Sequence, residues 1–214
     1  MTRPVKPTRP YRAPRRAEQA VATRRAILAA AGELFVSAGY AATTVAQIAH
    51  RAGVAVDTIY ASIGRKPAVM RALVEAAISG ADHAVPAEER AYVQQTAAAP
   101  TAREKFAAYS QGLVAIHRRL APIFLSLRTA AAIDTDCAAL WTEISDRRAA
   151  NMLRFAADLR GTGEIRADLS DRDVADIIWT MNAAEYFDLF TQRGWTPERI
   201  GTWLCDAWTQ LLLA

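Results

Sequence analysis

Glycines at four positions divide the first third of the chain into short helical segments, and this division constrains the fold more than any other feature. Apolar residues recur with helical spacing from about Thr23 to Ala38, and shorter stretches of the same kind follow. Glycine just past the last turn ends a helix readily, because it adopts the left-handed conformation without strain. The four stops are Gly39, Gly53, Gly64 and Gly80. The pattern therefore predicts helices over residues 23–38, 45–52 and 56–63, and a fourth from Pro67 to about residue 80.

The rest of the chain predicts longer helices. After a loop over residues 81–87, apolar stripes indicate a modest helix over 88–98 and longer ones over 101–120, 137–159, 173–192 and 197–213. Pro122 is expected to break or kink the helix that starts at Thr101, with the helical pattern resuming over 123–132. Hydrophobic residues make up 52% of the 214 residues, and strand-forming runs are scarce. We therefore expect an all-α fold.

The N-terminus is basic and rich in proline. Residues 1–25 carry eight Lys or Arg residues and one acid, whereas residues 26–214 carry a small excess of acids. Such asymmetry suggests a polyanionic partner for one end of the chain. Proline favours polyproline II, with about three residues per turn, and basic residues at every third position would line one edge of it: Arg3, Lys6, Arg9, Arg12 and Arg15. We expect residues 1–17 to form a disordered basic arm whose basic residues, Arg16 included, follow DNA phosphates. The alternative is a solvated tail in which the three-residue spacing of the basic residues is fortuitous.

Two of the short segments meet the local demands of a helix-turn-helix. This motif needs a small residue where its first helix meets the second, a glycine in the turn, and a branched apolar residue on the inner face of the second helix. Ala49, Gly53 and Ile59 fill these positions. A small core around them is expected from Leu34, Phe35, Ile48 and Val54. Such a pattern also arises in unrelated helical pairs, and its position directly after a basic arm gives it weight.

The segment with this pattern reads ILAAAGELFVSAGYAATTVAQIAHRAGVAVDTIYASIGRKPAVMRALV. It contains, in order, Leu34-Phe35, Gly39-Tyr40, Thr43-Thr44-Val45, Ile48-Ala49, Ala52-Gly53-Val54, Thr58-Ile59-Tyr60 and Gly64-Arg65-Lys66. In the order and spacing of these residues it resembles the N-terminal domain of TetR-family transcriptional regulators. The rest of the chain resembles the family only in helical architecture and length. The resemblance implies an N-terminal three-helix helix-turn-helix DNA-binding domain, followed by a helical ligand-binding and dimerisation domain.

By this resemblance, residues 56–63 form the recognition helix that enters the major groove of DNA. Its side chains expected at base edges are Val56, Asp57, Thr58 and Ala61. The residues expected at the phosphate backbone are Thr43 and Thr44, either of which can cap the helix over 45–52, and also Tyr60 and Lys66. Tyr60 has an alternative role as a half-buried aromatic residue that braces the recognition helix.

The recognition helix departs from the family pattern in two places. Ala55 stands where most members have a capping Ser or Thr, and Ser62-Ile63 stands where an aromatic pair is common. The lost cap costs about 1 kcal/mol unless the Asp57 carboxylate accepts from the first N–H groups, and it then cannot also accept from a cytosine amine. The helix has no Lys or Arg, so neutralisation of phosphates is expected from the arm and from Arg24, Arg25, Arg51, Arg65 and Lys66.

In the C-terminal half, the resemblance implies a small-molecule pocket and a homodimer interface formed by the last two helices. The pocket candidates lie on the helices over residues 101–160: Tyr109, Leu113, His117, Phe124, Arg128, Trp141, Asn151, Met152 and Phe155. Each could instead be core, because an aromatic stripe at helical spacing often is. His117 is expected at a rim or in solvent, since two arginines follow it. Trp-rich and weakly charged walls favour an apolar or aromatic effector.

These observations predict three segments: the arm over residues 1–17, the DNA-binding domain over 18–66 and the effector and dimerisation domain over 67–214. The predicted function is a ligand-responsive repressor that binds a palindromic operator as a dimer and is released by a small molecule. The link between the domains is expected in the helix that begins near Lys66. The alternatives are an activator of the same family, or a basic-armed helical adaptor without specific DNA binding.

Enzymatic chemistry is not predicted. The three histidines lie on separate segments without metal-ligand spacing, and neither a Gly-rich phosphate loop nor a nucleophile elbow occurs. We therefore expect no catalytic residue, no metal and no cofactor. Cys137 and Cys205 lack CxxC spacing and are expected to be buried, inert thiols in a reducing compartment. Neither a signal peptide nor a run of about 20 apolar residues is evident, so no membrane contact and a cytoplasmic location are expected.

Overall fold

The computed structural model describes residues 13–81 and 85–214. Within these ranges the chain forms ten α-helices, one short 3-10 helix and no strand. The α-helices are α1 (Ala13–Ser37), α2 (Val45–Ala52), α3 (Val56–Ser62), α4 (Lys66–Ser79), α5 (Ala91–Ala98), α6 (Ala102–Ala131), α7 (Thr135–Arg160), α8 (Asp171–Met181), α9 (Ala184–Gln192) and α10 (Pro197–Leu212), and the 3-10 helix is η1 (Ala87–Glu89). The all-α fold expected from the sequence is confirmed.

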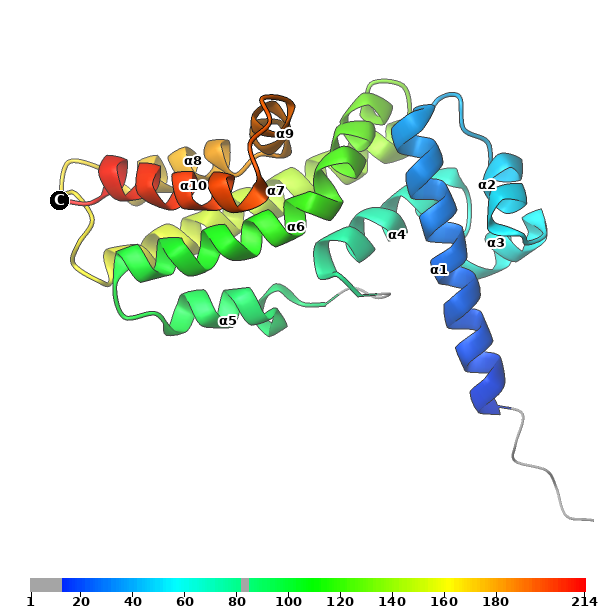
Figure 1. The fold of residues 1–214 in the computed structure, drawn as a ribbon, viewed down its shortest axis with the longest axis horizontal. Helices are drawn as coiled ribbons and strands as arrows, with labels where there is room; N and C mark the ends of the chain where they lie inside the picture. The colour runs from blue at the N-terminus through cyan, green and yellow to red at the C-terminus, as the bar shows by residue number, and fades with distance from the viewer. Residues whose placement is uncertain (1–12, 82–84) are drawn as a thin grey trace, which may run out of the picture.

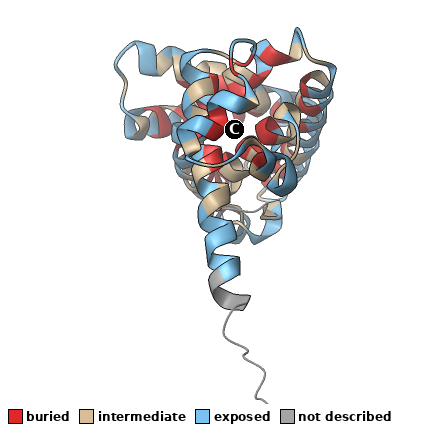
Figure 2. Ribbon diagram, turned by 90° about the vertical axis from the view of Figure 1, so that its right-hand side faces the viewer, coloured by how far each residue is buried: buried red, intermediate tan, exposed pale blue. Residues whose placement is uncertain are grey.

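Helix α6 forms the centre of the larger part of the molecule (Figure 1). It packs against α4, α5, α7, α9 and α10, while α8 lies on α7. Helices α1, α2 and α3 gather at one end, and α4 connects them to the rest by contacting α1, α6 and α7. The buried residues face the interior between these helices (Figure 2). Helix α4 therefore belongs to the packing of both parts.

Helix α1 begins earlier than the sequence pattern predicts. The expected start was about Thr23, after an extended arm over residues 1–17, but α1 starts at Ala13 with Pro14 in its first turn. Proline is tolerated there because the N–H groups of a first turn have no partner within the helix. Residues 16–22 are exposed, and this end of α1 projects away from the body (Figure 1, Figure 2). The extended arm is therefore wrong for residues 13–17.

Helix α6 continues through Pro122, so the expected break at this residue is wrong. The proline removes one backbone hydrogen bond from the helix. Its neighbours Ala121, Ile123 and Phe124 are all buried, at 3%, 9% and 2% exposure. The burial of these side chains on both sides of the proline outweighs the lost bond, because each large apolar residue contributes about 1.5–3 kcal/mol when buried.

The helix expected over residues 173–192 is in fact two helices. Helix α8 ends at Met181, and α9 begins at Ala184. Asn182 lies between them, with 4% exposure, and its side-chain amide donates to the Tyr109 hydroxyl at 2.8 Å. The contacts of this residue with α6 come from tertiary structure, which helical periodicity does not reveal.

The segment over residues 88–98 and one of the two cysteines also differ from what the sequence predicts. The modest helix expected over residues 88–98 is η1 followed by α5. Cys137 is buried, and burial raises the pKa of its thiol to about 11, whereas Cys205 is only half-buried. None of the helices in the described ranges combines the length and the apolar character that crossing a membrane requires.

Candidate functional site

The first candidate site is the helix-turn-helix formed by α2 and α3. Gly53 ends α2 with a φ of 67°, and its N–H donates to the His50 carbonyl oxygen at 3.2 Å. Ala49 on α2 and Ile59 on α3 are buried, at 2% and 0% exposure. The glycine turn and its two packing positions are therefore those expected from the sequence. They fix how α3 is presented to solvent.

The outer face of α3 carries Asp57, Tyr60 and Ala61. All three are exposed, Tyr60 to 50%, whereas Val56 and Thr58 are half-buried. Ala55 makes no side-chain cap, and the Asp57 carboxylate has no hydrogen-bond partner in the described part of the chain. Asp57 therefore does not replace the missing cap. Its carboxylate is open to a donor from outside, such as a base amine in a major groove.

The two threonines before α2 have different roles. Thr44 is the exposed N-cap, and it forms a capping box in which its hydroxyl accepts from the Gln47 N–H at 3.2 Å. Thr43 is 1% exposed, and its hydroxyl donates to the Gly39 carbonyl oxygen at 2.8 Å. Thr43 therefore faces the protein interior, and the expectation that it meets a phosphate is wrong. A phosphate at this helix start would meet the first N–H groups of α2 beside Thr44.

Two of the basic residues expected at phosphates already have partners in the protein. Arg51 pairs with Glu33, and the Lys66 ammonium lies over the Tyr40 ring, 4.1 Å from its centroid. Partial burial lowers the pKa of Lys66. Arg65 is exposed and makes no ion pair among the residues described. The Arg51 charge is therefore partly neutralised by Glu33, whereas the Arg65 charge is open to a partner from outside the chain.

Most of those N-terminal residues lie outside the described part of the chain, namely Arg3, Lys6, Arg9 and Arg12. Arg15 and Arg16 lie in the first turns of α1. The helical backbone at Arg15 cannot continue a polyproline II edge from Arg12, because the two conformations differ in ψ. The five-residue edge inferred from the sequence is therefore wrong at its last member.

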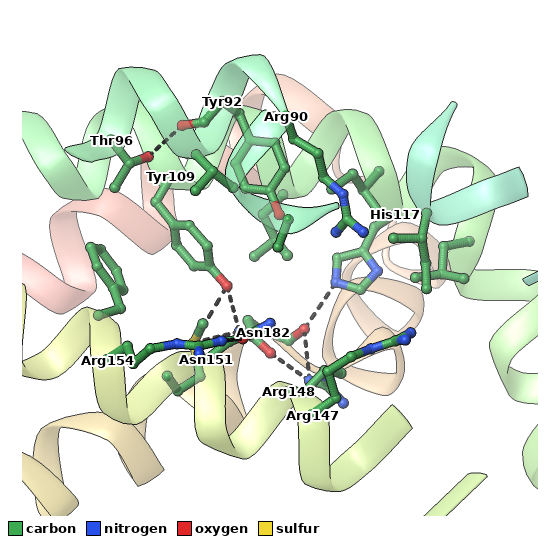
Figure 3. Close-up of a pocket in the computed structure, with 18 of the residues that line it drawn as sticks. Arg90, Tyr92, Thr96, Tyr109, His117, Arg147, Arg148, Asn151, Arg154 and Asn182 are labelled. Atoms are coloured by element: carbon green, nitrogen blue, oxygen red, sulfur yellow. Dashed lines mark hydrogen bonds between the residues drawn. The ribbon is translucent and has the colours of Figure 1, made fainter. Parts of the chain in front are cut away.

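The second candidate site is a cavity of about 590 Å³ between η1, α5, α6, α7 and the α8–α9 junction (Figure 3). Ile78 at the end of α4 also lines it. Seven of the nine residues expected in a pocket line this cavity: Tyr109, Leu113, His117, Phe124, Asn151, Met152 and Phe155. The cavity falls within the size range of small-molecule sites in proteins.

The other two pocket candidates do not reach the cavity. Arg128 is largely exposed and pairs with Glu185 at 2.8 Å. Trp141 packs against Phe124, with ring centroids 4.6 Å apart, and does not line the cavity itself. Both sit on the correct helices, but the helical stripe alone does not reveal how far along the helix the cavity extends.

His117 is buried and uncharged, so its expected place at a rim or in solvent is wrong. It is 5% exposed, and its ring stacks on Phe187 at 5.4 Å between centroids. Nε2 lies 2.9 Å from the Asn182 carbonyl oxygen, which can only accept, so Nε2 carries the proton. Burial lowers the pKa of His117 to about 4. The ring therefore stays neutral near pH 7.

Sequence reasoning missed the residues that give the cavity its polarity. Arg148 and Asn182 lie on its floor, and Arg90 and Tyr92 reach it from the opposite side (Figure 3). The Arg148 guanidinium donates through Nη2 to the Asn182 side-chain oxygen and to the carbonyl oxygens of Trp179 and Asn182. The only local signal was Asn182 itself, a weak helix former in the middle of an apolar pattern.

Helix α4 links the two sites through ion pairs and hydrogen bonds. Arg71 on α4 pairs with Glu143 on α7 through two contacts of 3.0 and 2.7 Å. Glu75 on α4 pairs with Arg147, a cavity residue, at 3.1 Å. At the N-terminal end of α7, the Asp134 N-cap accepts a hydrogen bond of 2.8 Å from the Tyr40 hydroxyl. Tyr40 belongs to the α1–α2 connection, so α7 contacts the part of the chain that holds the helix-turn-helix directly.

Comparisons with known proteins agree with this arrangement. Residues 27–77 match the family model of bacterial regulatory proteins, tetR family. No curated protein matches the chain. Among solved structures, the fatty acid degradation regulator FadR from Bacillus halodurans is 17% identical with a TM-score of 0.70, and the match covers 95% of this chain and 96% of that one.

Two further structures share the fold. NalD, the secondary repressor of the MexAB-OprM multidrug efflux pump in Pseudomonas aeruginosa, is 18% identical with a TM-score of 0.68, over 91% of this chain and 98% of that one. SmeT in complex with triclosan is 19% identical with a TM-score of 0.69, over 90% of this chain and 92% of that one. At such identities the structures establish a common fold, and the match over residues 27–77 confirms the family resemblance inferred from the sequence.

Proposed function

We propose that this chain, which carries the DNA-binding domain of TetR-family transcriptional regulators, is a ligand-responsive repressor. It would bind a palindromic operator as a homodimer and leave it when a small molecule occupies the cavity. One observation carries the proposal: a helix-turn-helix with an open outer face and a cavity of about 590 Å³ are joined by the same helix, α4. NalD is a repressor and SmeT binds triclosan, and both have this fold.

In this proposal α3 supplies selectivity and little charge. Asp57, Thr58, Tyr60 and Ala61 would meet the bases and adjoining backbone, while Thr44 and Lys66 would mark phosphate contacts. Since α3 has no basic residue, most counterion release would come from Arg65, Arg16 and the residues before α1. The DNA-binding domain comprises α1 to α3, and the effector domain starts with α4.

The dimer interface would lie on the outer faces of the last helices. Apolar residues are partly exposed there, with Ile177 and Met181 in an open groove on α8 and Leu211, 47% exposed, on α10. A second copy related by a two-fold axis would cover these residues on both chains. Such a dimer presents two copies of α3 to half-sites about 34 Å, or a multiple of it, apart.

Effector binding would act through α4 and α7. Ile78 and Arg147 line the cavity, and Arg147 holds Glu75 of α4. A ligand that changes the position of α7 therefore changes the support of α4, whose first residues adjoin Tyr40. The resulting change in the spacing of the two α3 helices would lower operator affinity. In an activator, ligand binding would act through the same helices but would raise operator affinity instead of lowering it.

Selection of bound sequences from a random DNA library tests the DNA-binding half of the proposal. We expect a palindromic site, a salt-dependent gel shift with it, and a 2:1 ratio of chain to duplex in sedimentation. Deleting residues 1–12 leaves α1 intact and should lower affinity for all sequences, and it should reduce the slope of log affinity against log salt by about 0.9 for each lost phosphate contact. Absence of any selected sequence would favour the adaptor alternative, and an unchanged slope would remove the role of the N-terminal basic residues.

A further inference from the structure

We propose that the effector is an amphipathic organic carboxylate, whose anionic group binds Arg148 and whose alkyl or aryl part fills the apolar remainder of the cavity. This inference rests on the proposed function, because it names the chemical class of ligand for the same cavity. It adds an anion to the apolar or aromatic effector expected from the sequence.

The Arg148 side chain is half-buried, and the groups that its hydrogen bonds and ring contacts reach are all neutral. Its hydrogen bonds to the described residues all come from one nitrogen, Nη2, and go to the Asn182 side-chain oxygen and two carbonyl oxygens. Nε and Nη1 have no acceptor among the described residues, although Arg148 lines the cavity. The guanidinium carbon of Arg148 lies 5.9 Å from the ring centroid of Phe124 and 5.3 Å from that of Trp179. A cation that is partly removed from water and has no counter-charge favours an anionic partner, and a ligand carboxylate would supply both the charge and the acceptors.

The acids around the cavity are already neutralised or lie in solvent. Asp158 pairs with the buried Lys105 at 2.9 Å, and Glu88 is exposed. Glu185, the acid whose charge acts on Arg148, is itself paired with Arg128 at 2.8 Å. None of these carboxylates forms an ion pair with Arg148 in the described part of the chain, so its charge remains available to a ligand.

The other arginines of the cavity add to its positive character. Arg90 donates to the Val85 carbonyl oxygen at 3.1 and 2.8 Å, and it points inward from the side opposite Arg148 (Figure 3). Arg154 donates to the Asn151 side-chain oxygen, and Arg147 is paired with Glu75. The cavity therefore favours one negative charge near its floor and disfavours a cation.

The rest of the cavity lining is apolar, and it determines the chemical character of the part of the ligand that lies beyond the carboxylate. Leucine, isoleucine, methionine and phenylalanine side chains surround the space above Arg148: Leu113, Ile116, Leu120, Phe124, Ile144, Met152 and Phe155. A small inorganic anion would leave this surface uncovered. An alkyl or aryl group attached to the carboxylate would cover it, with about 25 cal/mol for each Å² of apolar area removed from water.

Arg148 also has a structural role, which the test must separate from ligand binding. Nη2 donates to the carbonyl oxygens of Trp179 and Asn182 at 3.4 Å, at the C-terminal end of α8, where a cation is favoured by the helix dipole. One nitrogen suffices for that contact. The purely structural role predicts no preference between an acid and its neutral amide, whereas the proposal predicts a strong one.

The first measurement needs only the unaltered protein. Calorimetric titration of the full chain with octanoate and octanamide, and with 2-naphthylacetate and 2-naphthylacetamide, compares ligands that differ only in charge. We expect each acid to bind about tenfold more tightly than its amide, in keeping with a charge-assisted hydrogen bond. Equal or tighter binding of the amides would overturn the proposal.

The second measurement tests whether Arg148 is the residue responsible for the preference for acids over amides. In Arg148→Met the acid-to-amide ratio of affinities should fall to about one, because the anion partner is gone while the apolar lining stays. Arg172→Met is the matched control, since Arg172 is an exposed arginine paired with Asp176 on α8, away from the lining. It should keep the full preference. If Arg148→Met does not fold, Arg148→Lys replaces it, and a ratio unchanged in that variant would count against a bidentate contact at this position.

Operator binding by the same samples distinguishes a failure of the proposed function from a failure of the inference that the ligand is a carboxylate. A carboxylate that binds and also releases operator DNA supports the proposed function and the inference together. Binding of the amides alone, with operator release, overturns the inference and leaves the proposed function standing. Failure of all four compounds to bind overturns the inference, and the DNA-selection experiment then decides the proposed function by itself.

Discussion

Gly112 on α6 lies directly against Tyr92 on α5, and its replacement tests how the cavity is built. A Cβ added at Gly112 would lie 2.4 Å from both Cβ and Cγ of Tyr92. Carbon atoms in contact are about 3.5–4.0 Å apart, so Gly112→Ala requires Tyr92 and its helix to move by about 1 Å or more. Tyr92 lines the cavity, and its ring lies 6.2 Å from that of Tyr109. The substitution therefore disturbs one side of the ligand site.

The free energy of unfolding is set by two opposing effects. Overpacking of this kind costs about 1–3 kcal/mol, because the clash involves Cβ, which is close to the backbone of α5. Alanine in a helix interior recovers about 1 kcal/mol relative to glycine. We therefore expect Gly112→Ala to lose up to about 2 kcal/mol of stability. A ligand that fills the cavity should also bind less tightly.

Gly32→Ala is the matched control for this prediction. Gly32 is also inside a helix, and a Cβ there would meet only the flexible end of Leu73, at 3.4 Å from Cδ1. This variant keeps the gain in helix propensity without a rigid clash, so it should gain up to about 1 kcal/mol. Urea unfolding of both variants at one protein concentration measures the difference, which we expect to be about 1–3 kcal/mol. Equal stability of the two variants would refute the close approach of α5 to α6.

Three further predictions concern the charge and polarity of the two sites. Asp57→Ala should raise affinity for random DNA, because it removes a negative charge, and should lower the ratio of operator to random binding by about 5- to 100-fold in a competition gel shift; an unchanged ratio would place Asp57 away from the bases. The unfolded His117 binds a proton below about pH 6.5 and the folded one only below about 4, so stability should fall by about 3 kcal/mol as the pH drops through this window. His117→Gln should remove that part of the pH dependence of urea unfolding, and an equally steep dependence in the variant would assign it to other groups. Tyr40→Phe removes the hydroxyl that donates to Asp134 at 2.8 Å. It should lower the free energy of unfolding in urea by about 1–2 kcal/mol and weaken the effect of ligand on operator affinity. Full retention of that effect would exclude this contact from the connection between the cavity and the helix-turn-helix.

Local capping signals in the sequence predicted the bounds of α2 and the start of α10, whereas the Asp134 cap that starts α7 at Thr135, two residues before the expected start, was missed. Helix α2 has the predicted bounds because Thr44 caps it and Gly53 ends it in the left-handed conformation. Thr196 and Pro197 likewise begin α10, with the Thr196 hydroxyl accepting from the Arg199 N–H at 3.3 Å. Pro122 was misread because its effect depends on the burial of its neighbours, which is a property of the folded protein.

The candidate cavity could be predicted only in its apolar part. Tyr109, Leu113 and Met152 follow from the helical stripes of α6 and α7, because a stripe marks the inward face whether it meets core or cavity. Arg148 does not follow from any stripe. Within its own helix it reads as a solvated charge, and it becomes part of the cavity because α8 ends beside it at Asn182. That contact joins residues more than thirty positions apart, so no local pattern contains it.

Asn182 connects the cavity to α6 and α7, the two helices that reach from it to the proposed DNA-binding end. Its carbonyl oxygen accepts from His117 on α6 and from Arg148 on α7, and its amide donates to Tyr109. A carboxylate that accepts from Nε and Nη1 of Arg148 would bind a guanidinium whose Nη2 is already held by Asn182, so it would favour the positions of α7 that satisfy both contacts. The preceding residue on α7, Arg147, holds Glu75 of α4. Because a ligand shifts an equilibrium only by its difference in affinity for two states, the Arg148–Asn182 contact is where that difference would arise.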